Sequence, residues 1–184
     1  MPLTQLDPTA ALIVIDLQNG ITGMPTAHPA AEVIGRASQL AKAFRKRGLP
    51  VVLVNVTGRA PGRSDAGFPK FAFPPDWSDL VPELDSQPSD HLVSKQRWGA
   101  FIGTDLHEYL QEEGVTQVFV AGIATSVGVE STARSAYDHG YHVVLVTDAM
   151  TDRSEEAHRY SVDAVFPRMA EVDLTENVLK ALAK

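Results

Sequence analysis

The stretch ALIVIDLQNG, residues 11–20, decides the class of fold. Its first six residues form a nearly unbroken apolar run that ends in an acid, Asp16. A strand with one face in water alternates apolar and polar residues, whereas a continuous apolar run is typical of a strand buried on both faces of a parallel sheet. Residues 11–16 are therefore expected to form an inner strand of such a sheet.

Further apolar runs alternate with helical patterns along the rest of the chain. Strands are expected at residues 50–56, 91–93, 117–121 and 142–147, with a weaker one at 170–172. Helices are expected at residues 30–47, 106–113, 129–138, 154–165 and 175–183. Strand and helix alternating over 184 residues predict a single α/β domain, residues 1–184, whose parallel sheet carries helices on both faces.

One segment, residues 58–89, breaks the alternation because it is rich in proline and aromatic residues. A loop of that length without regular structure is often a lid or an oligomer contact. Its aromatic part, Phe68 to Trp77, would lose exposed apolar surface by packing against a second copy of the chain. The alternative is an irregular surface excursion anchored by its own aromatic side chains, and the sequence leaves both open.

Composition excludes several classes of protein. The 16 basic and 23 acidic residues give a net charge of −7, which opposes binding to nucleic acid or to an anionic membrane. No apolar run is long enough to span a membrane, and the first residues do not resemble a signal peptide, so a cytoplasmic protein is expected. The chain has no cysteine, which removes disulfides, thiolate metal ligands and thiol nucleophiles.

Chemistry-bearing residues follow three of the predicted strands. Ligands of open parallel sheets bind beyond the carboxyl ends of the strands, where Asp16, Lys95 and the small-residue turn 122–129 are expected. Each has a structural explanation when taken alone: Asp16 could cap a turn, Lys95 could be a solvated cation, and the glycines of the turn could serve close packing. Together at three strand ends they predict one site. Side chains nearby that could bind substrate are Gln18, Arg59, Arg97, Trp98 and Phe101.

Residues 11–20, 94–106 and 120–150 together resemble the isochorismatase-like hydrolase superfamily, which includes isochorismatases, nicotinamidases and N-carbamoyl amide hydrolases. The resemblance covers nearly the whole chain. It implies a three-layer α/β/α sandwich with six parallel strands in the order 3-2-1-4-5-6. It also implies a cis peptide bond between Ile123 and Ala124, and assembly into a homodimer or homotetramer.

Cysteine-dependent members of this family use an Asp, a Lys and a Cys, and the resemblance puts Asp16, Lys95 and Gly128 at these positions. Glycine cannot form a covalent intermediate. Isochorismatases are similar in having glycine there, and in them the Asp protonates a vinyl ether that water then attacks. The resemblance implies that Asp16 is the general acid, assisted by Lys95 and by the backbone N–H groups of Ala124 and Gly128. This role requires burial that raises the pKa of Asp16.

Two departures from the isochorismatase pattern argue against isochorismate as substrate. Isochorismatases have a tyrosine where this chain has Ala124, and a glutamine after the second strand, where this chain has Arg59 nearby. The metal ligands of nicotinamidases are absent from residues 55–59, so neither a metal nor another cofactor is expected. Asp148 and Asp152 are predicted to cap turns.

The sequence therefore predicts a hydrolase that acts on a small anionic metabolite without a covalent intermediate. Two alternatives stay open. The first is a family member that binds a small carboxylate without turning it over. The second is an amide hydrolase whose nucleophile has been changed from cysteine to glycine at position 128.

Overall fold

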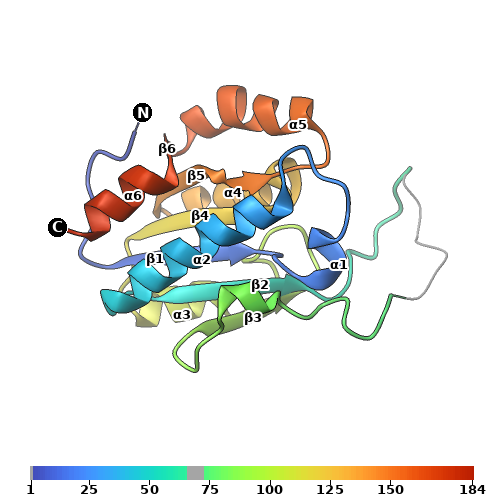
Figure 1. Cartoon of the computed structure of the whole chain (residues 1–184), viewed down its shortest axis with the longest axis horizontal. Helices are drawn as coiled ribbons and strands as arrows, with labels where there is room; N and C mark the ends of the chain where they lie inside the picture. The colour runs from blue at the N-terminus through green and yellow to red at the C-terminus, as the bar shows by residue number, and fades with distance from the viewer. Residues whose placement is uncertain (1, 66–72) are drawn as a thin grey trace.

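The computed structural model describes residues 2–65 and 73–184. Six parallel strands form one sheet in the order β3-β2-β1-β4-β5-β6, which confirms the predicted topology (Figure 1). The strands are β1 (Ala10–Ile15), β2 (Val51–Val56), β3 (His91–Lys95), β4 (Gln117–Ile123), β5 (His142–Thr151) and β6 (Glu171–Asp173).

Helices cover both faces of this sheet. Helices α2 and α6 lie over one face, and α3 and α4 lie over the other, which makes the predicted three-layer α/β/α sandwich (Figure 1). The α-helices are α1 (Asn19–Thr22), α2 (Ala30–Lys46), α3 (Leu106–Glu112), α4 (Glu130–Asp138), α5 (Glu155–Tyr160) and α6 (Thr175–Leu182). The shorter helical turns are η1 (Pro82–Leu84), η2 (Thr125–Val129), η3 (Ser161–Val165) and η4 (Phe166–Arg168). No helix in the described parts of the chain is both long and apolar enough to cross a membrane.

Strand β1 is buried along its whole length, as its unbroken apolar sequence predicted. Successive side chains of a strand point to opposite faces of the sheet. Leu12 and Val14 accordingly join the cluster under α2 and α6, while Ile13 and Ile15 join the cluster under α3 and α4. Full burial of each such side chain contributes about 1.5–3 kcal/mol to folding, so the apolar run stabilises both layers at once.

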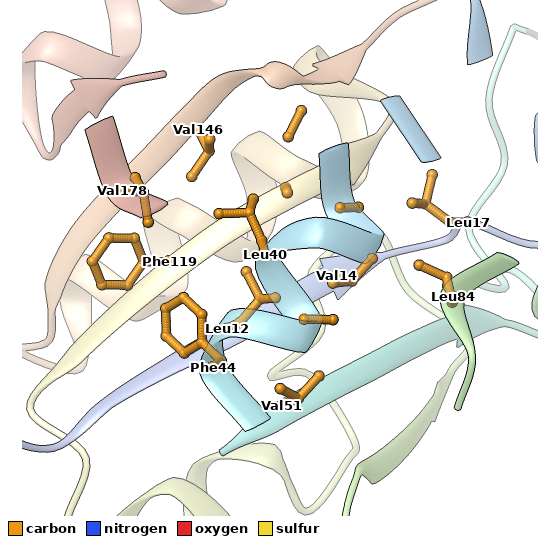
Figure 2. Close-up of a cluster of buried hydrophobic side chains, with 14 of the residues drawn as sticks. Leu12, Val14, Leu17, Leu40, Phe44, Val51, Leu84, Phe119, Val146 and Val178 are labelled. Atoms are coloured by element: carbon orange, nitrogen blue, oxygen red, sulfur yellow. The ribbon is translucent and has the colours of Figure 1, made fainter. Parts of the chain in front are cut away.

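Helix α2 presents an apolar stripe to the first of these clusters. Figure 2 shows Leu40 and Phe44 over the sheet, near Leu12 of β1 and Phe119 of β4. The Phe44 and Phe119 rings meet edge to face, with centroids 5.2 Å apart. This packing fixes the central strands β1 and β4, whose carboxyl ends carry the residues described below.

The carboxyl ends of β1 and β4 approach each other unusually closely. Gly122 has a φ of +120°, and a Cβ atom there would lie 2.1 Å from the backbone oxygen of Ile15. Only glycine fits this contact. Immediately after β1, Asp16 adopts a left-handed conformation with a φ of 51°, which turns the chain out of the strand. The acid and the turn after β4 are thereby brought together.

Part of the proline- and aromatic-rich segment is fastened to the end of β1. Backbone N–H groups of Asn19, Gly20 and Val81 bond the carbonyls of Asp79, Trp77 and Leu17, respectively. The Trp77 indole packs on Gly20, where a Cβ atom would lie 2.0 Å from the ring. Phe73 stacks on Trp77 with ring centroids 4.2 Å apart. Residues 66–72, including Phe68, lie outside the described residues.

Candidate active site

A cavity of about 340 Å³ lies at the carboxyl ends of the central strands. It is the place that the sequence predicted, because the residues following β1, β3, β4 and β5 all contribute to its walls. Of the site residues expected from the sequence, the cavity is lined by Asp16, Arg59, Lys95, Arg97, Trp98, Ala124 and Gly128.

Asp16 and Lys95 form a buried ion pair in this cavity. The Lys95 Nζ atom donates to Asp16 Oδ2 at 2.7 Å, and the two residues are 2% and 5% exposed, respectively. Lys95 Nζ also donates to the backbone oxygen of Arg97 at 3.2 Å, which fixes the ammonium group. The second carboxyl oxygen, Asp16 Oδ1, is buried without a hydrogen-bond partner in the described part of the chain. Leaving a buried polar atom without a partner is costly for stability.

Burial raises the pKa of Asp16 from 3.8 to about 6, and the neighbouring Lys95 charge offsets part of that rise. Removing the carboxylate from water disfavours its charged form more than the single cation favours it. A carboxyl group with this pKa can hold a proton near neutral pH and release it to a substrate.

The backbone of Gly128 lies directly against the acid. A Cβ atom at this position would lie 3.0 Å from Ile15 Cγ2 and 3.3 Å from Asp16 Oδ2, closer than ordinary van der Waals contact. Gly128 belongs to η2, which begins after a cis peptide bond between Ile123 and Ala124. This is the bond at which the resemblance implied a cis peptide.

Asp152, after β5, holds the η2 turn in place. Its Oδ2 atom accepts hydrogen bonds from the backbone N–H and the hydroxyl of Ser126, both at 2.8 Å. Its Oδ1 atom accepts from the backbone N–H groups of Arg153 and Ser154. The expected capping role therefore agrees with these contacts, and Asp152 also lines the cavity. Asp148 accepts from the backbone N–H and hydroxyl of Thr175 at the start of α6.

Two expected substrate-binding residues lie elsewhere. The amide of Gln18 is buried and is occupied by the backbone: it accepts from Val56 N–H at 2.8 Å and donates to the carbonyls of Val56 and Trp77. Phe101 is 7% exposed and packs against Tyr141 and other rings between α3 and α4. Neither residue lines the cavity. Gln18 is a brace for the cavity wall, and Phe101 belongs to the core.

Several wall residues were not singled out from the sequence. Trp77 comes from the proline-rich segment, whose aromatic content was the one available signal. The other unpredicted residues lie on loops or at strand and helix positions without a motif. They are Ile21, Met24, Thr26, Val56, Gly58 and Arg153, whereas Ile123 and Val127 belong to the predicted turn 122–129.

The cavity is apolar with a positive balance of charge. The cationic side chains of Arg59, Lys95, Arg97 and Arg153 line it together with two carboxyl groups. An excess of cations around a small apolar cavity favours an anionic ligand. Within residues 2–65 and 73–184, no three histidine, aspartate or glutamate side chains gather as metal ligands would.

The family model for the isochorismatase domain matches residues 10–177. The chain belongs to the isochorismatase family. It is 41% identical over 183 residues to the isochorismatase family protein YecD of Escherichia coli O157:H7, covering 95% of this chain and 96% of that protein. It is 36% identical over 181 residues to the family protein YwoC of Bacillus subtilis (strain 168), covering 92% of each.

A solved isochorismatase family protein from Burkholderia thailandensis has the same fold as this family member. The two structures give a TM-score of 0.94 at 39% sequence identity, with 98% of each chain covered. Sequence and structure therefore agree, and the chain is an isochorismatase-family hydrolase.

Proposed function

We propose that this isochorismatase-family hydrolase cleaves a small anionic metabolite by acid-assisted addition of water, with no covalent bond between substrate and protein. The observation that carries the proposal is the buried carboxyl group of Asp16. One of its oxygens is held by Lys95 at 2.7 Å, and it lies against Gly128, which offers no nucleophile.

Asp16 is the general acid in this scheme. In its protonated form it gives its proton to the substrate from Oδ1, because Oδ2 is occupied by Lys95. For a vinyl ether, the proton goes to the terminal carbon of the double bond, and water adds to the carbon that bears the oxygen. The adduct separates into an alcohol and a carbonyl compound, and the proton lost by the water returns to Asp16.

Lys95 has an electrostatic role in the same step. Its ammonium group stabilises the carboxylate that Asp16 becomes after proton transfer, and its own position is fixed by the Arg97 carbonyl. The backbone N–H groups of Ala124 and Gly128 would form the polar cradle for the substrate oxygen. Because Ala124 is smaller than the tyrosine of isochorismatases, we expect a substrate other than isochorismate.

Turnover of a panel of vinyl ethers, amides and esters bearing a carboxylate tests the proposal. We expect at least one to be hydrolysed and Asp16→Asn to lower the rate about 100-fold or more. Asp163→Asn, which removes an exposed carboxylate, should leave the rate unchanged. Equal rates for Asp16→Asn and wild type would refute the role of Asp16. Binding of a small acid without any turnover would favour the alternative of a carboxylate-binding protein.

The packing around Gly128 bears on whether a cysteine once stood there. A side chain at this position requires Ile15 and Asp16 to move by a few tenths of an ångström, which is a small adjustment. The packing is therefore compatible with either residue. Codon 128 of the genomic gene decides the matter: a glycine codon agrees with the proposal, and a cysteine codon would favour an amide hydrolase.

We also propose that the protein is a homodimer or homotetramer of single-domain chains. Trp98 is 67% exposed and Ile102, four residues later, is 55% exposed, while Phe73 is 45% exposed. Covering such apolar side chains by a second copy would remove them from water. Light scattering at micromolar concentration should give a multiple of the 19.9 kDa chain mass. A mass of one chain would reject this proposal.

A further inference from the structure

The turn after β5 brings Arg153 to the cavity, on the flank opposite Arg97. Arg97 follows β3 and Arg153 follows β5, and the strand order puts these two strands on either side of the β1–β4 pair (Figure 1). Arg153 takes no part in the proton transfer assigned to Asp16. Its position nevertheless puts a cation on the β5 side of the cavity.

The backbone that carries Arg153 is held from three directions. Its own N–H donates to Asp152 Oδ1 at 2.7 Å. The other oxygen of the same carboxylate binds Ser126 of η2, and the carbonyl of Asp152 accepts from the Ala27 N–H at 2.7 Å. A side chain on a segment fixed in this way loses little backbone freedom when it binds a ligand.

The guanidinium group of Arg153 has no acidic partner among the described residues. One of its nitrogens contacts the thioether sulfur of Met24, which is an uncharged and weak acceptor. The adjacent carboxylate of Asp152 is already occupied on both oxygens by Ser126, Ser154 and the backbone of Arg153. The N–H groups of the Arg153 guanidinium are thus available to hydrogen-bond an anion in the cavity.

Much of the cavity lining is apolar. Met24, whose sulfur Arg153 contacts, belongs to it together with Val127, Trp77 and Trp98. A strongly hydrated inorganic anion would lose its water against such walls without replacement, whereas a carboxylate on an apolar body would match both features. A planar guanidinium and a carboxylate form two parallel hydrogen bonds.

We propose that Arg153 is a specificity-determining residue that selects a substrate with a carboxylate on an apolar, ring-sized body. The proposal rests on the proposed function for one point, namely that the bond to be broken lies at Asp16 while the carboxylate lies at Arg153. It adds the chemical class of the substrate and the residue that recognises it.

Intrinsic fluorescence offers a direct binding assay, because both tryptophans of the chain line the cavity. Benzoate is titrated into the wild type, Arg153→Met and Arg153→Lys, and benzamide serves as the uncharged analogue. Arg159→Met is the matched control, since Arg159 is exposed on α5 and outside the cavity lining. It removes the same charge from the neighbourhood without touching the proposed contact.

We expect Arg153→Met to weaken benzoate binding about tenfold or more, the usual effect of losing a charge-assisted pair. Arg153→Lys should weaken benzoate binding less, because the lysine ammonium keeps the positive charge but cannot form the two parallel hydrogen bonds of a guanidinium group. Benzamide binding should be the same in wild type and Arg153→Met, and Arg159→Met should change the benzoate affinity less than about twofold.

Three results would overturn the inference: equal benzoate affinities for wild type and Arg153→Met, an equal loss for benzamide, or no binding of benzoate by the wild type. The test is separate from that of the proposed function. If Asp16→Asn still binds benzoate through Arg153 and no substrate is hydrolysed, the proposed function fails alone. If Asp16-dependent hydrolysis of acids is unchanged in Arg153→Met, the specificity role of Arg153 fails alone.

Discussion

Asp16 concentrates three unfavourable features in one residue. Its backbone is left-handed with a φ of 51°, its side chain is almost entirely buried from solvent, and one carboxyl oxygen has no hydrogen-bond partner among the described residues. A strained backbone conformation alone costs on the order of 1–3 kcal/mol, and such residues cluster at functional sites. The contacts of Lys95 offset part of this cost. The combination is understandable if the carboxyl group is kept for proton transfer.

The pH dependence of the reaction should follow the protonated form of Asp16. Because burial raises the pKa of Asp16 to about 6, the acid form disappears as the pH rises through that value. We expect kcat/KM to fall about tenfold for each pH unit above it. Any residual activity of Asp16→Asn should lack this break. A kcat/KM that instead rises through about pH 6 would mean that Asp16 acts as a base.

Replacing Gly128 by cysteine tests whether the pocket still supports the family's nucleophile position. The new thiol would lie next to Asp16 and close to Lys95, near the start of the helical segment after β4. The Lys95 cation and the helix start lower a thiol pKa, and the Asp16 carboxylate can accept the thiol proton. Since the chain has no other cysteine, stoichiometric labelling by iodoacetamide at neutral pH reports this site alone.

For Gly128→Cys we expect alkylation faster than that of a free thiol such as N-acetylcysteine. The rate should fall when Asp16→Asn or Lys95→Ala is added to the same protein. A cysteine that reacts no faster than the free thiol would mean that the pocket has lost its activating geometry. In that case a binding role becomes the better account of the site.

At the scale of elements, the apolar runs predicted the strands well because burial on both faces leaves an unambiguous pattern. Strand β5 continues to Thr151, four residues beyond the expected end. The expectation stopped at residue 147 because polar residues interrupt the apolar run there. The helix expected at 154–165 is α5 followed by the π turn η3, since helical spacing of side chains does not distinguish the two hydrogen-bonding patterns. The short helix α1 was not expected.

Gln18 joins three elements, and its replacement by leucine should destabilise the fold. The change removes the amide partner of the N–H and carbonyl groups of Val56, while the carbonyl of Trp77 keeps the Gly20 N–H. Buried groups left unsatisfied cost about 1–3 kcal/mol each, so we expect Gln18→Leu to lower the free energy of unfolding by roughly 2–4 kcal/mol. Urea denaturation measures this loss.

Gln111→Leu provides the control for Gln18→Leu, because Gln111 is exposed on α3. It should change the free energy of unfolding by less than about 0.5 kcal/mol. The tryptophan emission of Gln18→Leu should also move to longer wavelength, since Trp77 loses a bond that holds its segment to the end of β1. Equal stability of the two variants would show that the Gln18 amide does not brace the cavity wall.

For the whole molecule, the sequence predicted that Asp16, Lys95 and the turn 122–129 lie together, because the carboxyl ends of neighbouring parallel strands lie at the same edge of the sheet. It could not predict Trp77, Met24 or Arg153 as wall residues. Their places depend on how loops fold back over the strand ends, as in the bonds from Gly20 to Trp77 and from Ala27 to Asp152. That Gln18 lies outside the lining was unpredictable for the same reason, since proximity along the chain to Asp16 does not reveal which groups a side chain bonds.

The free energy of unfolding should depend on pH because of the buried carboxyl group of Asp16. The pKa of Asp16 is higher in the folded protein, about 6, than its ordinary value of 3.8, so the folded state binds this proton more tightly. The stabilising contribution of the protonated group is full below the ordinary value and is lost as the pH rises to about 6. A pKa difference of this size corresponds to roughly 3 kcal/mol.

Asparagine at position 16 does not titrate, so the comparison with Asp16→Asn isolates this effect. Asp7 and Asp173, whose pKa values are lowered by hydrogen bonds despite partial burial, are present in both proteins and cancel. We expect the free energy of unfolding of the wild type, relative to Asp16→Asn, to fall by up to roughly 3 kcal/mol between about pH 4 and pH 7. Urea denaturation at a series of pH values gives this difference. A difference that stays flat or rises with pH would place the pKa of Asp16 at or below its ordinary value, and the carboxyl group would then be ionised at the pH where the proposed reaction needs its proton.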